Sequence, residues 1–136
     1  MNTIIIGIAG GTGSGKTSLA KGILSEYGEG EVAVIEQDSY YNDLSHILYE
    51  ERVIQNYDHP DSIDIKLFES HLQGLLNGES VNVPTYDFST HVRMDKTTII
   101  TPHHVIVVEG ILTLHYTQLR DLFAIKIFVD TPADIR

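Results

Sequence analysis

The chain has 136 residues, of which 42% are hydrophobic and 21% charged, a composition that predicts a single globular domain and excludes a disordered or low-complexity protein. Its formal net charge of −10, with only nine lysines and arginines, argues against a partner such as nucleic acid, because phosphate backbones require dense positive charge. The absence of cysteine excludes disulfides, a thiol nucleophile and a cysteine-ligated zinc site.

The first predicted unit is a strand, a loop and a helix. Residues 4–9 are a β-branched apolar run without polar alternation, which is typical of a strand buried on both faces of a parallel sheet. This run reaches glycines after a few residues, so it predicts neither a signal peptide nor a membrane span, and we expect a cytoplasmic protein without a membrane partner. Apolar residues then recur at helical spacing from Leu19 to Tyr27, and Gly28 ends the pattern.

The same unit repeats along the chain. Residues 32–36 are predicted to be a second strand, which ends at Gln37 and Asp38. Asp64 is predicted to cap a helix that ends at Gly78. The stretch from residue 40 to 60 is polar and irregular, so we expect a loop or a short helix there.

Two more buried strands are predicted at residues 105–109 and 124–130, and residues 131–136 resemble the start of a helix. Strands that alternate with helices predict an α/β fold of the P-loop NTPase type, with a parallel sheet and flanking helices.

Residues 80–100 depart from this alternation of strands and helices. They alternate at period two on both sides of a polar turn, which predicts a protruding β-hairpin, and Pro84 assigns its first arm to an edge.

A phosphate-binding motif follows the first strand. Gly10, four further residues, and then Gly15, Lys16 and Thr17 satisfy G-x-x-x-x-G-K-[ST]. The glycines let backbone N–H groups turn inward toward an anion, Lys16 reaches the outer phosphates in a catalytic role, and the Thr17 hydroxyl is available to Mg²⁺. The predicted nucleotide-binding residues are Gly10, Gly11, Thr12, Gly13, Ser14, Gly15, Lys16, Thr17 and Ser18.

Two carboxylates are predicted at the same end of the sheet. The apolar residues 105–108 bring Glu109 to a strand end, where it is a candidate Mg²⁺ ligand, although a surface glutamate would give the same pattern. Asp38 ends the second strand, and there it could take the proton from a hydroxyl that attacks the γ-phosphate. Its alternative is a turn-forming aspartate. No N-K-x-D motif for guanine is present, so we expect ATP rather than GTP.

The hairpin carries candidate substrate residues. Tyr86 and Phe88 lie two apart on one predicted strand face, with His91 just beyond them. Such a set could stack a planar base and bond to its edge, and core packing is about equally compatible with it. We expect a hairpin that stands off the sheet to offer less core for these rings to enter.

With these residues assembled, the chain resembles the uridine kinase (uridine–cytidine kinase) family of P-loop kinases. The resemblance extends over essentially all 136 residues, and its most specific stretches are "YDHPD" and "YDFSTH". It implies phosphorylation of the 5′-hydroxyl of uridine or cytidine by ATP with Mg²⁺. It further implies that Asp38 is the base and also touches the metal region, that Thr17 and Glu109 hold Mg²⁺, that Asp58 accepts the ribose hydroxyls, and that Tyr86, Phe88 and His91 frame the pyrimidine.

The resemblance also implies a departure at the C-terminal end. Members of that family continue with an arginine-rich lid, another strand and a helix, so we expect either a fragment of a longer enzyme or a chain shown without its last part, which binds nucleotide and catalyses poorly. Two alternatives stay open: another small-molecule kinase such as phosphoribulokinase, and a nucleotide-binding module without turnover. The oligomeric state, including a homo-oligomer, is not determined by the sequence.

Overall fold

The computed structural model describes residues 2–10, 16–27, 31–44, 46–52, 62–87, 89–90, 92–111 and 113–129. Within the first helix, only the backbone is described for Lys16, Thr17, Ser18, Ala20, Leu24 and Tyr27. In chain order the elements are β1 (Ile4–Gly10), α1 (Lys16–Tyr27), β2 (Val32–Glu36), the 3₁₀ helix η1 (Gln37–Tyr40), α2 (Tyr49–Arg52), α3 (Ile65–Leu76), β3 (Val81–Asp87), β4 (Val92–Ile100), β5 (Val105–Gly110), α4 (Thr117–Arg120) and β6 (Ile125–Val129).

Among the described residues, four parallel strands form the central sheet, in the order β2-β5-β1-β6. β1 and β5 are the inner strands, and every residue of β5 is buried. This burial explains their continuous apolar sequences, since each strand packs against neighbouring elements on both faces. The prediction of an α/β fold with a parallel sheet and flanking helices is confirmed.

Each face of the sheet has its own core, because successive side chains of a strand point to opposite faces. Val105 and Val107 of β5 belong to the core that also packs against Leu19 and Ile23 of α1. Ile106 and Val108 of the same strand belong to the opposite core. That second core is larger and contains residues of η1, α3, the hairpin and α4.

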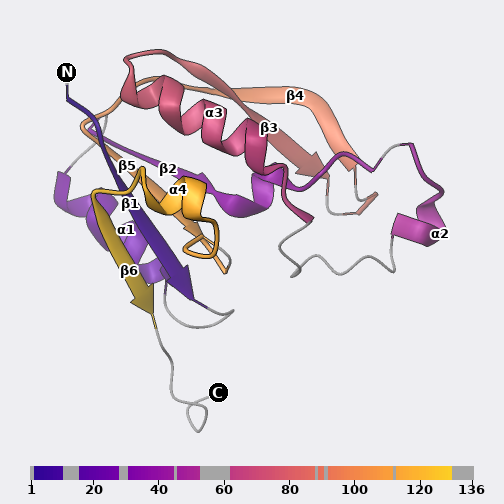
Figure 1. Cartoon of the computed structure of the whole chain (residues 1–136), viewed down its shortest axis with the longest axis horizontal. Coiled ribbons are helices and arrows are strands. Elements are labelled where there is room, and N and C mark those ends of the chain that lie inside the picture. Colours follow the sequence, from indigo (N-terminus) through magenta and orange to yellow (C-terminus); the bar gives the residue numbers. More distant parts are fainter. Residues whose placement is uncertain are drawn as a thin grey trace, which may run out of the picture.

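The predicted hairpin is confirmed as an antiparallel pair, β3 and β4, that forms a sheet of its own. Its register shifts between Pro84 and Tyr86, at the proline that cannot donate a ladder hydrogen bond. Figure 1 shows the hairpin and α3 together at one side of the central sheet, with α2 beyond the far end of the hairpin.

The predicted ends of α3 are confirmed by their local hydrogen bonds. The Asp64 side chain caps the helix by accepting a hydrogen bond from the Leu67 N–H at 3.2 Å. At the other end Gly78 has a φ of 85°, a left-handed conformation that glycine adopts without steric cost. Residue types that favour helix boundaries therefore stand at both ends.

The prediction that residues 124–130 form a buried strand is wrong about burial. Within the described part of the chain, β6 is the outermost strand of the sheet on the side of β1, with which it pairs. Ile127 and Val129 pack against the core on the α1 side, but Phe128, on the other face, is 68% exposed. An apolar sequence fits an edge strand as well as an inner one, so the pattern did not separate the two.

Candidate functional site

The carboxyl ends of three strands meet at one edge of the central sheet. In the parallel register, Glu109 of β5 is aligned with Ile8 of β1 on one side and with Glu36 of β2 on the other. The turn η1 follows β2 directly, and Gly10 ends β1. The segments that carry the predicted phosphate loop, base and metal ligand therefore leave the sheet side by side.

The phosphate motif is described only in part. Gly10 is the buried last residue of β1, and α1 begins at Lys16, as the motif predicts. Residues 11–15 lie outside the described part of the chain, and so do the side chains of Lys16, Thr17 and Ser18. α1 has 12 residues, so its first turn carries the free N–H groups and the positive dipole end that favour an anion.

Glu109 is the predicted metal ligand whose burial and position in the sheet the structure describes. Its side chain is only 8% exposed, which excludes the alternative of an ordinary surface glutamate. Val105 and Val107 point to the α1 face, so the alternation of the strand puts Glu109 on that face as well. The carboxylate therefore lies on the same side of the sheet as the helix whose first turn contains Thr17.

Asp38 lies in η1 between two buried anchors. Gln37 is fully buried, and the Thr113 hydroxyl donates to its Oε1 at 3.5 Å. Tyr40 is also fully buried, and its ring stacks on Phe68 at a centroid distance of 4.0 Å. Asp38 itself is half-buried. The turn is thus fixed at both ends, and the carboxylate that it carries stays accessible.

The predicted substrate residues have different outcomes. Asp58, Phe88 and His91 lie outside the described residues. Tyr86 is only 5% exposed and packs edge-on against Tyr41, with ring centroids 5.2 Å apart. The expectation that the hairpin offers its rings little core is therefore wrong for Tyr86, because α3 and η1 extend the core beneath the hairpin.

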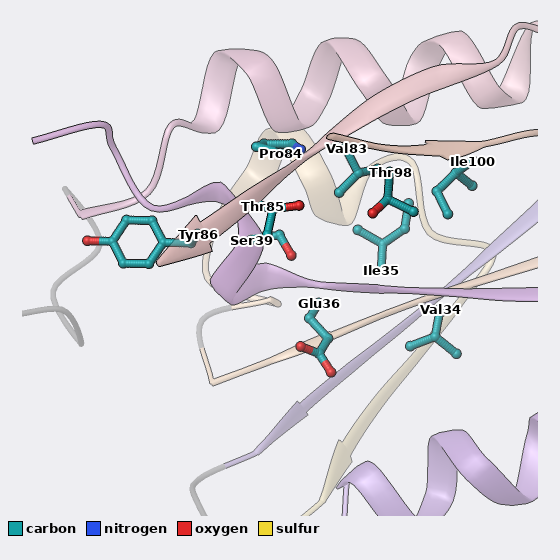
Figure 2. A pocket seen from close by; sticks show the side chains of 10 residues that line it. All are labelled: Val34, Ile35, Glu36, Ser39, Val83, Pro84, Thr85, Tyr86, Thr98 and Ile100. Atoms are coloured by element: carbon teal, nitrogen blue, oxygen red, sulfur yellow. The ribbon is translucent and has the colours of Figure 1, made fainter. Parts of the chain in front are cut away.

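A pocket of about 390 Å³ lies between β2 and the hairpin. Figure 2 shows Ile35 of β2 and Thr98 and Ile100 of β4 around this space, while the ring of Tyr86 extends away from them. Of the predicted site residues that the structure describes, only Tyr86 lines it. The pocket is lined by Val34, Ile35, Glu36, Ser39, Val83, Pro84, Thr85, Tyr86, Thr98 and Ile100.

A polar cluster behind the Asp38 turn was not predicted from the sequence. The Tyr40 hydroxyl lies 2.8 Å from Nδ1 of His71, and Arg93 forms an ion pair with Asp64 at 3.5 Å. Burial lowers the pKa of His71, and the Arg93 charge lowers it further, while Asp64 partly opposes both. Burial likewise raises the pKa of Tyr40 above its ordinary value. The sequence places His71 on a predicted helix and Arg93 on a predicted strand. These patterns do not indicate which residues the two side chains contact.

Among the described residues, no group of three or more His, Asp or Glu side chains is arranged to hold a metal ion. None of the described helices is long and apolar enough to cross a membrane.

The chain matches a family model described as "Phosphoribulokinase / Uridine kinase family" over residues 5–136. A protein named uridine kinase from Clostridium perfringens strain 13 is 54% identical over 133 residues, which are 98% of this chain and 64% of that protein. A protein of the same name from Halalkalibacterium halodurans is 50% identical, over 98% of this chain and 63% of its own length. The chain thus spans less than two thirds of these relatives.

Solved structures with a similar fold are more distant in sequence. A structure titled "a Possible Uridine Kinase" from Bacillus stearothermophilus has a TM-score of 0.70 and 21% identity, over 99% of this chain and 74% of that chain. A D-glycerate 3-kinase from Cryptococcus neoformans has a TM-score of 0.57 and 20% identity, over 82% of this chain and 44% of that chain. At such identities the likeness concerns the fold.

Proposed function

Because the chain belongs to the phosphoribulokinase/uridine kinase family, we propose that it transfers the γ-phosphoryl group of ATP to the 5′-hydroxyl of uridine or cytidine. The products are ADP and the nucleoside monophosphate. The observation that carries the proposal is the position of Asp38 on a turn fixed at both ends, at the same edge of the sheet as the end of β1 and separated from it by β5. The relatives named uridine kinase support the choice of a nucleoside as acceptor.

The phosphates of ATP would bind at the end of β1. Backbone N–H groups of the glycine-rich segment and of the first turn of α1 bind phosphate oxygens, and the Lys16 ammonium reaches the outer phosphates. These charges hold the γ-phosphoryl group while negative charge develops on it. With nine lysines and arginines in the whole chain, this binding depends on local geometry rather than on a general positive field.

A magnesium ion would bind at this edge of the sheet. Mg²⁺ prefers oxygen ligands, and Glu109 offers a buried carboxylate on the face of α1, whose first turn carries the Thr17 hydroxyl. Asp38 is a further candidate near this region. When bound, the ion would neutralise charge on the β- and γ-phosphate oxygens.

Asp38 would act on the acceptor. Its carboxylate takes the proton of the 5′-hydroxyl while that oxygen attacks the γ-phosphorus, and the bond from this phosphorus to the bridging oxygen of ADP breaks. Asp58 would accept hydrogen bonds from the ribose hydroxyls, and Tyr86, Phe88 and His91 would frame the pyrimidine. The buried setting of Tyr86 supports a fixed wall rather than a mobile stacking group.

Ribulose 5-phosphate is the second candidate acceptor, because the family description names phosphoribulokinase beside uridine kinase. A phosphorylated acceptor needs positive charge near its pocket. The arginine of the hairpin nearest to Tyr86 in register is Arg93, and its guanidinium is already paired with Asp64. This pairing favours the uncharged nucleoside.

The test is ADP production with uridine, cytidine, ribulose 5-phosphate or no acceptor. It is run on this chain and on a chimera that continues after Arg136 with the remaining third of the C. perfringens relative. Acceleration by uridine or cytidine in either protein supports the proposal. Acceleration by ribulose 5-phosphate alone supports the second candidate. If none of the three acceptors accelerates ADP production in either protein, both candidate functions are wrong.

A further inference from the structure

Arg93 of β4 connects three elements around the Asp38 turn. Its Nη2 donates to the main-chain oxygen of Tyr41, the first residue after η1, at 3.1 Å. The same nitrogen lies 3.5 Å from Oδ2 of Asp64, whose other oxygen caps α3. In addition, the main-chain N–H of Arg93 donates to Asp43 Oδ1 at 3.4 Å. One side chain of the hairpin therefore holds the exit of η1 and the start of α3 together.

The carbonyl that Arg93 binds belongs to a tightly paired segment. Tyr41 forms a bridge with Ile63, and the Asp64 N–H donates to the Tyr40 oxygen at 2.7 Å. The Asn42 N–H donates to the Ser62 oxygen at 2.8 Å. Residues 40–42 thus lie against residues 62–64, and Arg93 joins this pair to the hairpin.

The hairpin holds Tyr41 at two points. Arg93 is directly opposite Tyr86 in the β3–β4 register. The ring of Tyr86 packs edge-on against the ring of Tyr41, while Arg93 binds the Tyr41 main-chain oxygen. Contacts from two cross-strand neighbours to one residue leave little freedom for the hairpin to shift relative to η1.

An arginine suits this position better than a lysine. The guanidinium is planar and can reach two acceptors from one fixed orientation, whereas an ammonium is a point charge on a flexible stem. The side chain of Arg93 is 23% exposed and that of Asp64 33% exposed, so solvent screens the charge pair. The bond to the Tyr41 oxygen, which fixes main chain, is therefore the contact with the greater consequence for geometry.

We propose that Arg93 is a positioning residue: it sets the turn that carries Asp38 at a fixed place relative to the hairpin wall formed by Tyr86. This role rests on the proposed function, in which Asp38 takes a proton from a hydroxyl whose base is framed by the hairpin. Displacement of a reacting group by about 1 Å can lower a rate by about a hundredfold. The loss would fall on the acceptor side, because β1 and α1 do not contact Arg93 in any described interaction.

The test compares Arg93→Met, Arg93→Lys and Arg120→Met in the protein, or in the chimera if only that is active, below the melting temperature of each variant. Arg120 is an exposed arginine of α4 whose side chain bonds to Thr117, so it is the control. We expect Arg93→Met to lower kcat/KM for uridine by about ten- to a hundredfold and to leave KM for ATP within about twofold. Arg93→Lys should recover part of the loss.

Hydrogen exchange separates this role from the proposed function. In Arg93→Met the amides of residues 40–43 and 62–65 should exchange faster, and those of β1 and β5 should not. If the wild type has no uridine-dependent turnover, the proposed function fails, and the exchange pattern alone decides whether Arg93 fixes the turn. If the wild type is active, two results would show that the positioning role is wrong. One is that Arg93→Met lowers activity only in proportion to its folded fraction. The other is that the amides of Arg93→Met exchange at the same rates as those of Arg120→Met.

Discussion

The hydroxyl of Tyr40 lies 2.8 Å from Nδ1 of His71, and the Tyr40 ring is stacked on Phe68 with an angle of 3° between the ring planes. Tyr40 is the last residue of η1, and both partners are on α3. The contact therefore ties the turn that carries Asp38 to a helix of the main core. The position of Asp38 therefore depends on how Tyr40 packs against α3.

Removal of the Tyr40 hydroxyl should weaken this tie without opening a cavity. We expect Tyr40→Phe to lower the free energy of unfolding by about 1 kcal/mol, because one hydrogen bond to a half-buried imidazole is lost while the stacked ring remains. Urea unfolding measures the change. Tyr49→Phe is the control, since Tyr49 is 48% exposed and its hydroxyl bond to the Ser89 oxygen is long at 3.3 Å. Equal losses in the two variants would contradict the anchoring role.

His71 should make stability depend on pH. Its folded pKa is lowered by burial first and then by the Arg93 charge, against a smaller opposing effect of Asp64. The unfolded chain therefore binds more protons, so the contribution of neutral His71 is complete above about pH 6.5 and is lost as the pH falls below that value. Urea unfolding at about pH 7.5 and about pH 5.5 should show a larger loss in wild type than in His71→Gln. Equal losses would mean that His71 titrates alike in both states.

Much of the fold could be predicted because local patterns and tertiary structure agree. Some patterns are compatible with only one local structure. Examples are the apolar runs of β1 and β5, the helix cap at Asp64 and the helix end at Gly78. β6 was misjudged because an apolar strand sequence does not say whether the strand lies inside the sheet or at its edge. The core beneath the hairpin was also missed, since it is built from η1 and α3, which are distant in sequence from Tyr86.

The candidate site was predictable where a motif has a fixed spacing. Asp38 and Glu109 follow apolar strands, and parallel topology brings such ends together. Arg93 could not be assigned a role, because its acceptors are a main-chain oxygen of Tyr41 and the cap residue Asp64. Contacts of this kind depend on the packing of three elements, which no local pattern encodes.

A methyl group at Gly110 should disturb the Asp38 turn. A Cβ there would overlap the side chain of Gln37, the fully buried first residue of η1. We expect Gly110→Ala to lower the free energy of unfolding by about 1–3 kcal/mol, as overpacking does. Gly22→Ala in α1 has no atom within 4 Å of the new Cβ and should stabilise by about 0.5–1 kcal/mol. Urea unfolding of both tests the pair, and a neutral Gly110→Ala would show that Gln37 can move aside.

The two oxygens of Asp64 should be separable by substitution. Asp64→Asn keeps an oxygen that can accept from the Leu67 N–H and loses the charge that faces Arg93. Asp64→Ala loses both contacts and should lower the free energy of unfolding by about 1–2 kcal/mol. We expect Asp64→Asn to lose less than half of that, because the ion pair is partly exposed. Urea unfolding at low and high salt measures these changes. An equal loss of unfolding free energy in both variants would mean that the ion pair with Arg93, and not the helix cap, is the main contribution of Asp64 to stability.

Removal of the charge of Asp38 should separate turnover from nucleotide binding. Asp38→Asn preserves the size of a side chain held between the buried Gln37 and Tyr40, so the fold should be unchanged. A general base contributes about 10²–10⁴-fold, and we expect uridine-dependent ADP production to fall within that range. ATP affinity, measured by calorimetry, should stay within about twofold, because the phosphates bind at the end of β1. Asp121→Asn, an exposed residue after α4, is the control. If Asp38→Asn weakens ATP binding as strongly as it slows turnover, Asp38 acts on the metal or the nucleotide instead of on the acceptor hydroxyl.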